Sequence, residues 1–294
     1  MIAVMGAAGN VGGKVADLLL REGEQVRVLQ HRRDLTGLAE RGAEVVEGDA
    51  LDVEALRAFF KGATSALVLL PEDVADPAFV ENRSRMSRAI RDALRATGVT
   101  HVVLLSFVGA ARADAPGPPA GLHEFERLLG ELSVNVLTLR SAMYMDYLLA
   151  SIPLMRAQGV NGSAIRGDVR IPMVATKDVA REAADRLRRR DFTGHEVKLL
   201  LGPEDLTMTD VTRAIGARLG MPDLPYVQLP AEGVRAALVG AGMAEEVAGL
   251  IVAMQLALNE GLSFDGVQRT ATSATPTRFV DILRERLPHT GEPA

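Results

Sequence analysis

A glycine-rich segment near the start of the chain constrains its fold more than any other feature. Three glycines spaced as G-x-x-G-x-x-G, over residues 6–12, directly follow an apolar run at residues 2–5 and precede a helical pattern. Glycine has no β-carbon, so the backbone of such a turn can approach a phosphate group and present amides at the N-terminus of the helix. In this strand–turn–helix context the segment predicts the first unit of a dinucleotide-binding fold; a turn without a ligand is the alternative.

Short apolar runs alternate with helical patterns through the first half of the chain. The runs are rich in Val, Leu and Ile without regular polar alternation, which is typical of parallel strands buried on both faces. The repetition predicts an α/β fold with a Rossmann-type, doubly wound parallel sheet. We expect strands at residues 2–5, 25–30, 44–47, 65–70, 101–105 and 134–139, and helices from about residue 11 and at residues 53–60, with Asp52 as N-cap, 77–97 and 122–132.

The second half of the chain has fewer strand-like runs. Thr207 and Asp210 have the T-x-x-D spacing of a capping box, and Thr176 is a candidate helix cap. We expect one strand that returns to the main sheet and no separate second sheet. We therefore interpret residues 1–150 as the NAD(P)-binding core and residues 151–294 mainly as a smaller C-terminal α/β lobe that binds substrate. Its expected elements are a strand near residues 195–201 and helices at residues 176–189, 208–219, 231–239 and 244–260.

Composition excludes several classes of function. The 294-residue chain has no cysteine, which excludes disulfides, thiolate-zinc sites, iron–sulfur clusters and cysteine nucleophiles, and we predict no metal site. A net charge of −5 argues against direct nucleic-acid binding. No apolar run reaches the roughly 18 residues of a membrane span, and the N-terminus lacks the pattern of a signal peptide. We expect a cytoplasmic protein that does not enter a membrane.

The end of the second predicted strand indicates which dinucleotide binds. Enzymes selective for NAD(H) usually place a carboxylate there to bind the ribose hydroxyls. Here His31, Arg32 and Arg33 come first, and Asp34 follows them. Guanidinium groups suit bidentate pairing with a 2′-phosphate, so this segment favours NADP(H) over NAD(H). A solvated basic loop is the alternative, and the sequence does not decide which of the three side chains contacts the phosphate.

Residues that follow the later strands complete the predicted cofactor site. Asp49 fits two roles, because it can accept a hydrogen bond from the adenine amino group or form an Asx turn. Leu70 ends the fourth strand, and Ser106 and Phe107 follow the fifth, where they help shape the pocket. The predicted cofactor-binding residues are Gly6, Ala8, Gly9, Asn10, Val11, Gly12, His31, Arg32, Arg33, Asp49, Ala50, Leu70, Ser106 and Phe107.

Five segments, in this order, resemble the NmrA-like family of atypical short-chain dehydrogenases/reductases and its bacterial NAD(P)H:quinone oxidoreductase branch. They are GAAGNVGG, GAEVVEGDALD at residues 42–52, HVVLLSFVGA at residues 101–110, LTLRSAMYMDYLL at residues 137–149 and TKDVA at residues 176–180. The resemblance implies an extended Rossmann core, a smaller C-terminal lobe and NADP(H) in the cleft between them. Members often place an arginine just after the second strand, where this chain has His31 with Arg32 next.

The resemblance also locates the expected catalytic positions. Related reductases use a serine, then Tyr-x-x-x-Lys about 13 residues later. Ser106 matches the serine, but Pro119 stands in the place of the tyrosine and His123 in that of the lysine. Proline has no proton to donate, so ordinary ketone reduction lacks its usual acid. Two roles fit His123: a proton donor near neutral pH, or a structural hydrogen bond at the start of a helix.

Tyr144 lies just past the sixth strand, at the expected nicotinamide end of the cleft. It can flank the nicotinamide ring or donate a hydrogen bond, and plain core packing is the alternative. We expect Tyr147 to pack in the core and Arg140 to form a structural ion pair. The predicted catalytic residues are His123 and Tyr144.

The sequence favours an NADPH-dependent reductase that transfers hydride directly to a quinone-like or other conjugated electrophile. The alternative is a non-catalytic NADP(H)-sensing regulatory protein. The first needs a small-molecule substrate, and the second needs a regulatory protein partner. The apolar pattern at residues 244–258 fits either the core or a homodimer interface.

Overall fold

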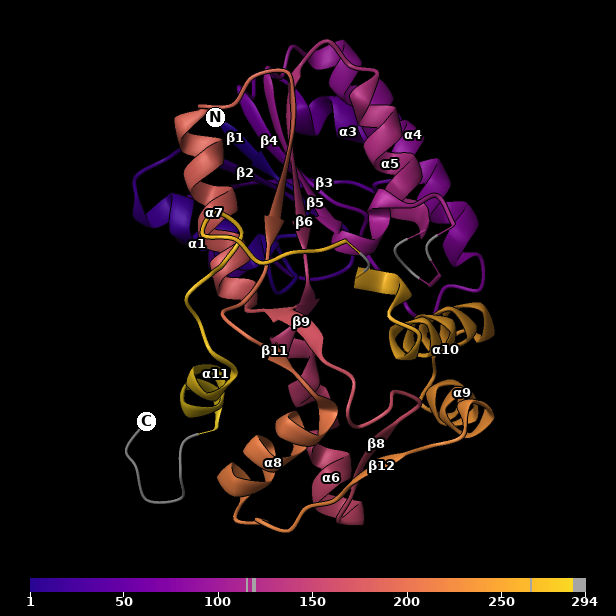
Figure 1. The fold of residues 1–294 in the computed structure, drawn as a ribbon. Coiled ribbons are helices and arrows are strands. Elements are labelled where there is room, and N and C mark those ends of the chain that lie inside the picture. Colours follow the sequence, from indigo (N-terminus) through magenta and orange to yellow (C-terminus); the bar gives the residue numbers. More distant parts are fainter. Residues whose placement is uncertain (115, 118–119, 265, 288–294) are drawn as a thin grey trace.

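A seven-stranded parallel sheet forms the centre of the molecule (Figure 1). The computed structural model describes residues 1–114, 116–117, 120–264 and 266–287. The chain runs from β1 to β3 in one direction across the sheet and then returns to β4 on the other side of β1, so a topological switch point lies between β1 and β4. In sheet order the strands are β10 (His195–Leu200), β6 (Asn135–Ser141), β5 (His101–Phe107), β4 (Ser65–Val68), β1 (Ile2–Val4), β2 (Val26–Gln30) and β3 (Glu44–Glu47).

The inner strands are buried on both faces, as the unbroken apolar runs predict. Every residue of β1 and β4 is buried, whereas the edge strand β3 exposes Glu44 and Glu47 at its two ends. The predicted fold class and the return of β10 to the sheet are confirmed. Two strands extend further than predicted, because β5 and β6 continue their parallel ladder through polar residues, up to the pair Phe107 and Ser141.

Helices cover the two faces of the sheet and form two apolar cores. On one face, α1 (Gly12–Arg21) and α7 (Thr176–Arg189) pack together over the sheet. On the other face lie α3 (Val53–Phe60), α4 (Phe79–Thr97) and α5 (Ala120–Gly130). Asp52 accepts hydrogen bonds from two amides of α3, which confirms it as the N-cap. The second half of the chain thus supplies both a strand and a helix to the core.

The second lobe begins where β6 passes into β7 and lies beyond the carboxyl edge of the sheet (Figure 1). Its buried apolar residues form a third core, separate from the two beside the main sheet. No helix in the described ranges is long and apolar enough to cross a membrane. The remaining elements are α2 (Thr36–Ala39), η1 (Val108–Ala111), β7 (Met143–Tyr144), η2 (Met145–Ser151), α6 (Ile152–Gln158), β8 (Asn161–Ser163), β9 (Ile171–Val174), β11 (Asp205–Leu206), α8 (Met208–Leu219), β12 (Tyr226–Gln228), α9 (Ala231–Gly240), α10 (Glu245–Asn259), η3 (Leu262–Phe264) and α11 (Phe279–Arg286).

The expectation of no second sheet is wrong. The second lobe contains a three-stranded sheet, in the order β11-β9-β7, and a two-stranded sheet of β12 and β8. These strands are two to four residues long, too short to show a period-2 pattern in sequence. The capping box of α8 is confirmed, because the side chains of Thr207 and Asp210 each accept a hydrogen bond from the other residue's amide.

Candidate functional site

The turn between β1 and α1 requires glycine at its tightest points. Gly6 has a φ of +67°, and a β-carbon on Gly12 would lie 2.3 Å from the Gly6 carbonyl oxygen. The amide of Gly9 donates to the same oxygen at 2.8 Å, which closes the turn. No side chain caps α1, and within the described ranges the amides of Asn10 and Val11 donate to no acceptor. Free amides at a helix N-terminus fit a diphosphate group.

The exposed loop after β2 carries the basic residues His31–Arg33. The carboxylate that comes next in the sequence, Asp34, accepts hydrogen bonds from the hydroxyl (2.6 Å) and the amide (2.9 Å) of Thr36, which lower the pKa of that carboxyl. Arg33 lies beside the glycine-rich turn, with Nη1 3.5 Å from the Ala8 carbonyl oxygen. The loop therefore brings a guanidinium group toward the turn, while the carboxylate that could serve ribose hydroxyls is bonded locally.

The other two basic residues of this loop face carboxylates. Arg32 forms an ion pair with Asp73, with 2.5 Å between Nη1 and Oδ2, and Nδ1 of His31 lies 3.8 Å from Oδ2 of Asp49. Oδ1 of Asp49 accepts a hydrogen bond from the Leu51 amide at 2.9 Å, which is an Asx turn. Asp49 therefore takes the structural role that the sequence left open, and its contact with adenine stays a prediction.

Three further predicted contacts lie deeper in the molecule. Ala50 and Leu70 are buried in the core beneath the α3–α5 face, and the Leu70 carbonyl accepts a hydrogen bond from Nη1 of Arg83 at 3.4 Å. The Phe107 ring packs against Phe264 of the second lobe, with 5.9 Å between ring centroids. Phe107 thus lies between the sheet and the lobe, while direct contact of these residues with a cofactor stays a prediction.

Ser106, the match for the serine of related reductases, is buried at the end of β5. Its hydroxyl donates to Oε1 of Glu126 at 2.5 Å. Arg140 pairs with the same carboxylate, at 2.6 Å between Nη2 and Oε2, which confirms the structural ion pair predicted for Arg140. The Ser106 hydroxyl is therefore held within a polar cluster between β5, β6 and α5.

His123 lies in α5 and bonds to the backbone. Its Nδ1 is 2.9 Å from the carbonyl oxygen of Ala110. A carbonyl oxygen only accepts, so this bond assigns the proton to Nδ1 and leaves Nε2 as the second ring nitrogen. No hydrogen bond or ring contact joins His123 to Tyr144 across the described ranges. Pro119, at the position of the missing tyrosine, lies outside the described residues.

Tyr144 contacts the end of β6 directly and the glycine-rich turn through Tyr147. Its Oη lies 3.0 Å from Oγ of Ser141, which lies 2.9 Å from the Ser106 carbonyl oxygen. Desolvation raises the pKa of the Tyr144 hydroxyl, so this group keeps its proton at neutral pH. Its ring meets Tyr147 edge-on at 5.4 Å, and the Asn10 side chain hydrogen-bonds to Tyr147. The expectation that Tyr147 packs in the core is wrong, because it is 51% exposed.

Lys14, Asp146 and Thr176 form a polar cluster that contacts the glycine-rich turn and was not predicted from the sequence. Nζ of Lys14 donates to the Asn10 carbonyl oxygen (2.8 Å) and to the Thr176 hydroxyl (3.0 Å). Asp146 accepts hydrogen bonds from the amide and the hydroxyl of Thr176, at 2.9 and 2.6 Å. The prediction that Thr176 caps α7 is therefore wrong: Ala175 is the N-cap, and the distant Asp146 takes the free amide. Burial lowers the pKa of Lys14.

A comparison with known proteins decides the family. A model of the NmrA-like family matches residues 1–278. The chain belongs to the NmrA-like family. A curated NmrA-like family domain-containing oxidoreductase from a Cladobotryum species is 36% identical over 114 residues, which are 36% of this chain and 33% of that protein. The matched region thus spans about a third of the relative's length.

Solved structures show the same fold over nearly the whole NmrA-like chain. The NADPH-dependent quinone oxidoreductase of Escherichia coli, solved with NADPH, has a TM-score of 0.82 at 24% identity and covers 97% of this chain and 99% of its own. The triphenylmethane reductase of a Citrobacter species has a TM-score of 0.78 at 21% identity, with 97% and 99% covered. Nmra, a negative transcriptional regulator solved with NAD, has a TM-score of 0.65 at 17% identity, with 97% and 90% covered. Because one fold serves several functions, these matches establish the fold.

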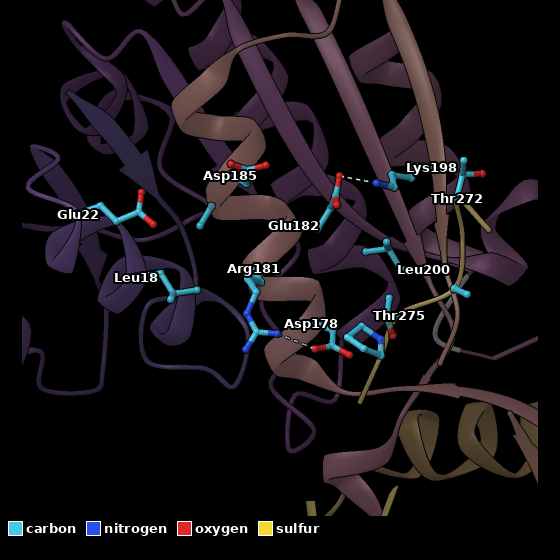
Figure 2. A pocket seen from close by; sticks show the side chains of 13 residues that line it. Leu18, Glu22, Asp178, Arg181, Glu182, Asp185, Lys198, Leu200, Thr272 and Thr275 are labelled. Atoms are coloured by element: carbon cyan, nitrogen blue, oxygen red, sulfur yellow. Dashed lines mark hydrogen bonds and ion pairs between the residues drawn. The ribbon is translucent and has the colours of Figure 1, made fainter. Parts of the chain in front are cut away.

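A hollow of about 400 Å³ in this NmrA-like chain lies apart from the site just described. Figure 2 shows it beside α7, β10 and residues 272–276, and none of the predicted site residues lines it. Asp178 pairs with Arg181 and Glu182 with Lys198 within its wall, and Glu22 and Asp185 both pair with Arg188 outside it. We therefore place the candidate site at the carboxyl edge near the switch point, where open α/β sheets bind ligands.

Proposed function

We propose that this NmrA-like chain is an NADPH-dependent reductase that transfers hydride to a quinone-like or other conjugated electrophile. The observation that carries the proposal is the meeting of two features: free amides at the start of α1, and a tyrosine pair that contacts the same turn through Asn10. The resemblance in fold to an NADPH-bound quinone oxidoreductase supports it.

NADP(H) is the proposed cofactor, in preference to NAD(H). Arg33 lies beside the glycine-rich turn, and Arg32 lies next to it in the same loop. Asp34, which could otherwise bind ribose hydroxyls, is engaged with Thr36. Two guanidinium groups close to a diphosphate site favour a ligand with an additional phosphate.

The residues of the chain would bind the cofactor and supply a proton. The amides of Asn10 and Val11 would hold the diphosphate, and the bound reduced nicotinamide supplies hydride. Tyr144 would donate its Oη proton to the substrate oxygen that becomes anionic. Ser141 has a single hydroxyl proton, which can turn from the Ser106 carbonyl oxygen to the new phenolate and stabilise it until water restores the proton.

The proposed substrate class follows from what the site lacks. The Tyr-x-x-x-Lys pair is absent, and a phenol with a raised pKa gives up its proton only to an oxygen that is already basic. A conjugated electrophile meets this requirement, because it takes hydride at carbon first and becomes a basic oxygen anion afterwards. An isolated ketone needs the proton at the same time as the hydride.

A second candidate function is a non-catalytic sensor of the NADP(H) redox state. Two observations favour it: the Ser106 hydroxyl is held by Glu126, and His123 is bonded to the backbone of Ala110. Both positions then serve structure rather than proton transfer. A sensor must bind the oxidised and reduced cofactor with different affinities, because a ligand shifts an equilibrium only by its differential affinity.

One pair of measurements separates these functions. Protein saturated with NADPH is mixed with a panel of quinones, and the loss of reduced-nicotinamide absorbance is followed. Calorimetry then gives the affinities for NADPH and NADP⁺. Turnover supports the reductase. Unequal affinities without turnover support the sensor, and equal affinities without turnover contradict both.

A further inference from the structure

One ion pair crosses the entrance to the glycine-rich turn. Arg32 follows β2, and Asp73 follows β4, with 2.5 Å between Nη1 and Oδ2. In the sheet, β1 lies between these two strands and leads directly into the turn at Gly6. Because all three strands are parallel, their carboxyl ends lie at the same edge. The pair therefore spans the end of β1, where a dinucleotide would enter.

The two partners differ in how firmly they are held. Oδ1 of Asp73 accepts a hydrogen bond from the Ala75 amide at 3.1 Å, and its carbonyl oxygen accepts one from the Asp76 amide at 3.1 Å, so a local turn fixes the carboxylate. Arg32 is exposed, at 73% of its side chain, and among the described residues its one hydrogen bond is to Asp73, beside a weaker electrostatic attraction to Asp76. An arginine that gives up this partner can swing away, while Asp73 stays in place.

We propose that Asp73 competes with the 2′-phosphate of NADP(H) for Arg32 and so limits the preference of this chain for NADP(H) over NAD(H). The inference rests on the proposed binding of a nicotinamide dinucleotide at the glycine-rich turn. A phosphate monoester carries nearly two negative charges at neutral pH and accepts bidentate hydrogen bonds from arginine, so it can displace one carboxylate. NAD(H) presents only hydroxyls at that position and leaves the pair closed.

Competition with Asp73 should weaken the binding of NADP(H) but not that of NAD(H). Binding of NADP(H) opens the ion pair and leaves the Asp73 carboxylate, fixed by its turn, close to a dianion. Binding of NAD(H) does neither. Removal of the Asp73 charge should therefore strengthen NADPH binding much more than NADH binding.

The test uses Asp73→Asn, which keeps an oxygen for the Ala75 amide but removes the charge. Calorimetry should show an NADPH Kd that falls about two- to fivefold, within the range of an exposed charge pair, and an NADH Kd that changes less than about 1.5-fold. Asp76→Asn is the matched control, because Asp76 belongs to the same turn and carries the same charge, but it hydrogen-bonds to Asn82 and Ala78 and attracts Arg32 only weakly, without a direct contact. It should change the ratio of the two affinities clearly less than Asp73→Asn does.

A second variant tests whether the gain passes through Arg32. In the double variant Asp73→Asn with Arg32→Gln, the gain in NADPH affinity should vanish, because the freed guanidinium is gone. Equal tightening for NADPH and NADH, an equal effect of Asp76→Asn, or a gain that survives Arg32→Gln would each overturn the competition and leave dinucleotide binding intact. If the parent protein binds neither dinucleotide, the proposed function itself is contradicted, and the proposed competition no longer applies.

Discussion

At the scale of single residues, the candidate site combines groups that are neighbours in the sequence with groups that only the fold brings together. The three glycines of the turn, and the basic residues after β2, each lie within a few consecutive residues. Arg32 instead meets Asp73, which lies 41 residues away in sequence. The hydrogen bonds of Asp146 to Thr176 likewise depend on how the second lobe meets the core. A local sequence pattern therefore predicts the first kind of contact but not the second.

Gly12→Ala should damage both folding and cofactor binding. The added β-carbon would lie 2.3 Å from the carbonyl oxygen of Gly6, so the turn must shift. We expect a loss of about 1–3 kcal/mol in unfolding free energy, as for other overpacked sites, and an NADPH Kd that rises about tenfold or more, since each 1.4 kcal/mol is tenfold. Gly37→Ala is the control, because its β-carbon would meet nothing within 4 Å. Urea unfolding and calorimetry measure the two effects, and a Gly12→Ala protein that binds NADPH normally would contradict the assignment of the turn.

Tyr144→Phe tests the proposed proton donor. The change removes the hydroxyl next to Ser141 and keeps the ring that packs on Tyr147. With a quinone that the parent protein reduces, kcat should fall by about 100-fold or more, as for the loss of a general acid, while the NADPH Kd stays within about twofold. Tyr226→Phe, which loses a hydroxyl bonded to Ser163 in the second lobe, is the matched control. An unchanged kcat in Tyr144→Phe would remove Tyr144 from the mechanism.

At the scale of elements, predictions succeeded where a capping residue or a long apolar period marks the boundary. The helix at residues 53–60 has its expected bounds because Asp52 caps it, and α8 begins at its predicted capping box. The short strands of the second lobe were missed, since β7 and β11 have two residues each and pair with distant segments. Strands this short are defined by their partners rather than by their own sequence.

Asp210→Ala should destabilise α8 in a pH-dependent way. Asp210 closes the capping box with Thr207, and hydrogen bonding from Thr207 holds the pKa of Asp210 below its ordinary value of 3.8. A carboxyl with a lowered folded pKa stabilises the fold above its unfolded pKa and loses this effect as the pH falls through the folded value. We expect a loss of about 1 kcal/mol at pH 7, which shrinks below pH 3.8. Thermal unfolding across this range checks it. Asp168→Ala, at an exposed ion pair with Arg166, should show almost no loss, and a difference for Asp210→Ala that is constant with pH would contradict the assigned cause.

At the scale of the whole molecule, the sequence predicted the central sheet but not how the lobe attaches to it. The repeated strand–helix units determine the sheet, because connections between parallel strands have few allowed arrangements. The attachment depends on contacts such as that of Lys14 with Thr176, which are separated by 162 residues. No periodic pattern within one element reports such a contact.

Asp146→Asn should loosen the junction between the core and the lobe. The carboxylate accepts two hydrogen bonds from Thr176 and lies 3.8 Å from Nζ of Lys14. Hydrogen bonds to a charged group contribute about 1.5–3 kcal/mol, so the unfolding free energy should fall by up to that amount. NADPH binding should weaken as well, because Lys14 also holds the Asn10 carbonyl of the glycine-rich turn. Urea unfolding with and without NADPH measures both effects.

The matched control for this junction is Asp168→Asn, at an exposed pair with Arg166. It should change neither the unfolding free energy nor the affinity measurably, because exposed ion pairs contribute little. An Asp146→Asn protein as stable as this control would show that the two parts are held together by apolar packing alone.

The late position of α7 and β10 in the chain has a consequence for biosynthesis. The sheet gains its last strand only at residues 195–200, and α7, which shields the same face as α1, comes directly before it. A nascent polypeptide stopped near residue 150 therefore leaves Val103, Leu137 and Leu139 without their cover. We expect the Rossmann core to be completed during synthesis only after the first part of the lobe, up to β9, has emerged, and a fragment ending at residue 150 to aggregate unless a chaperone holds it.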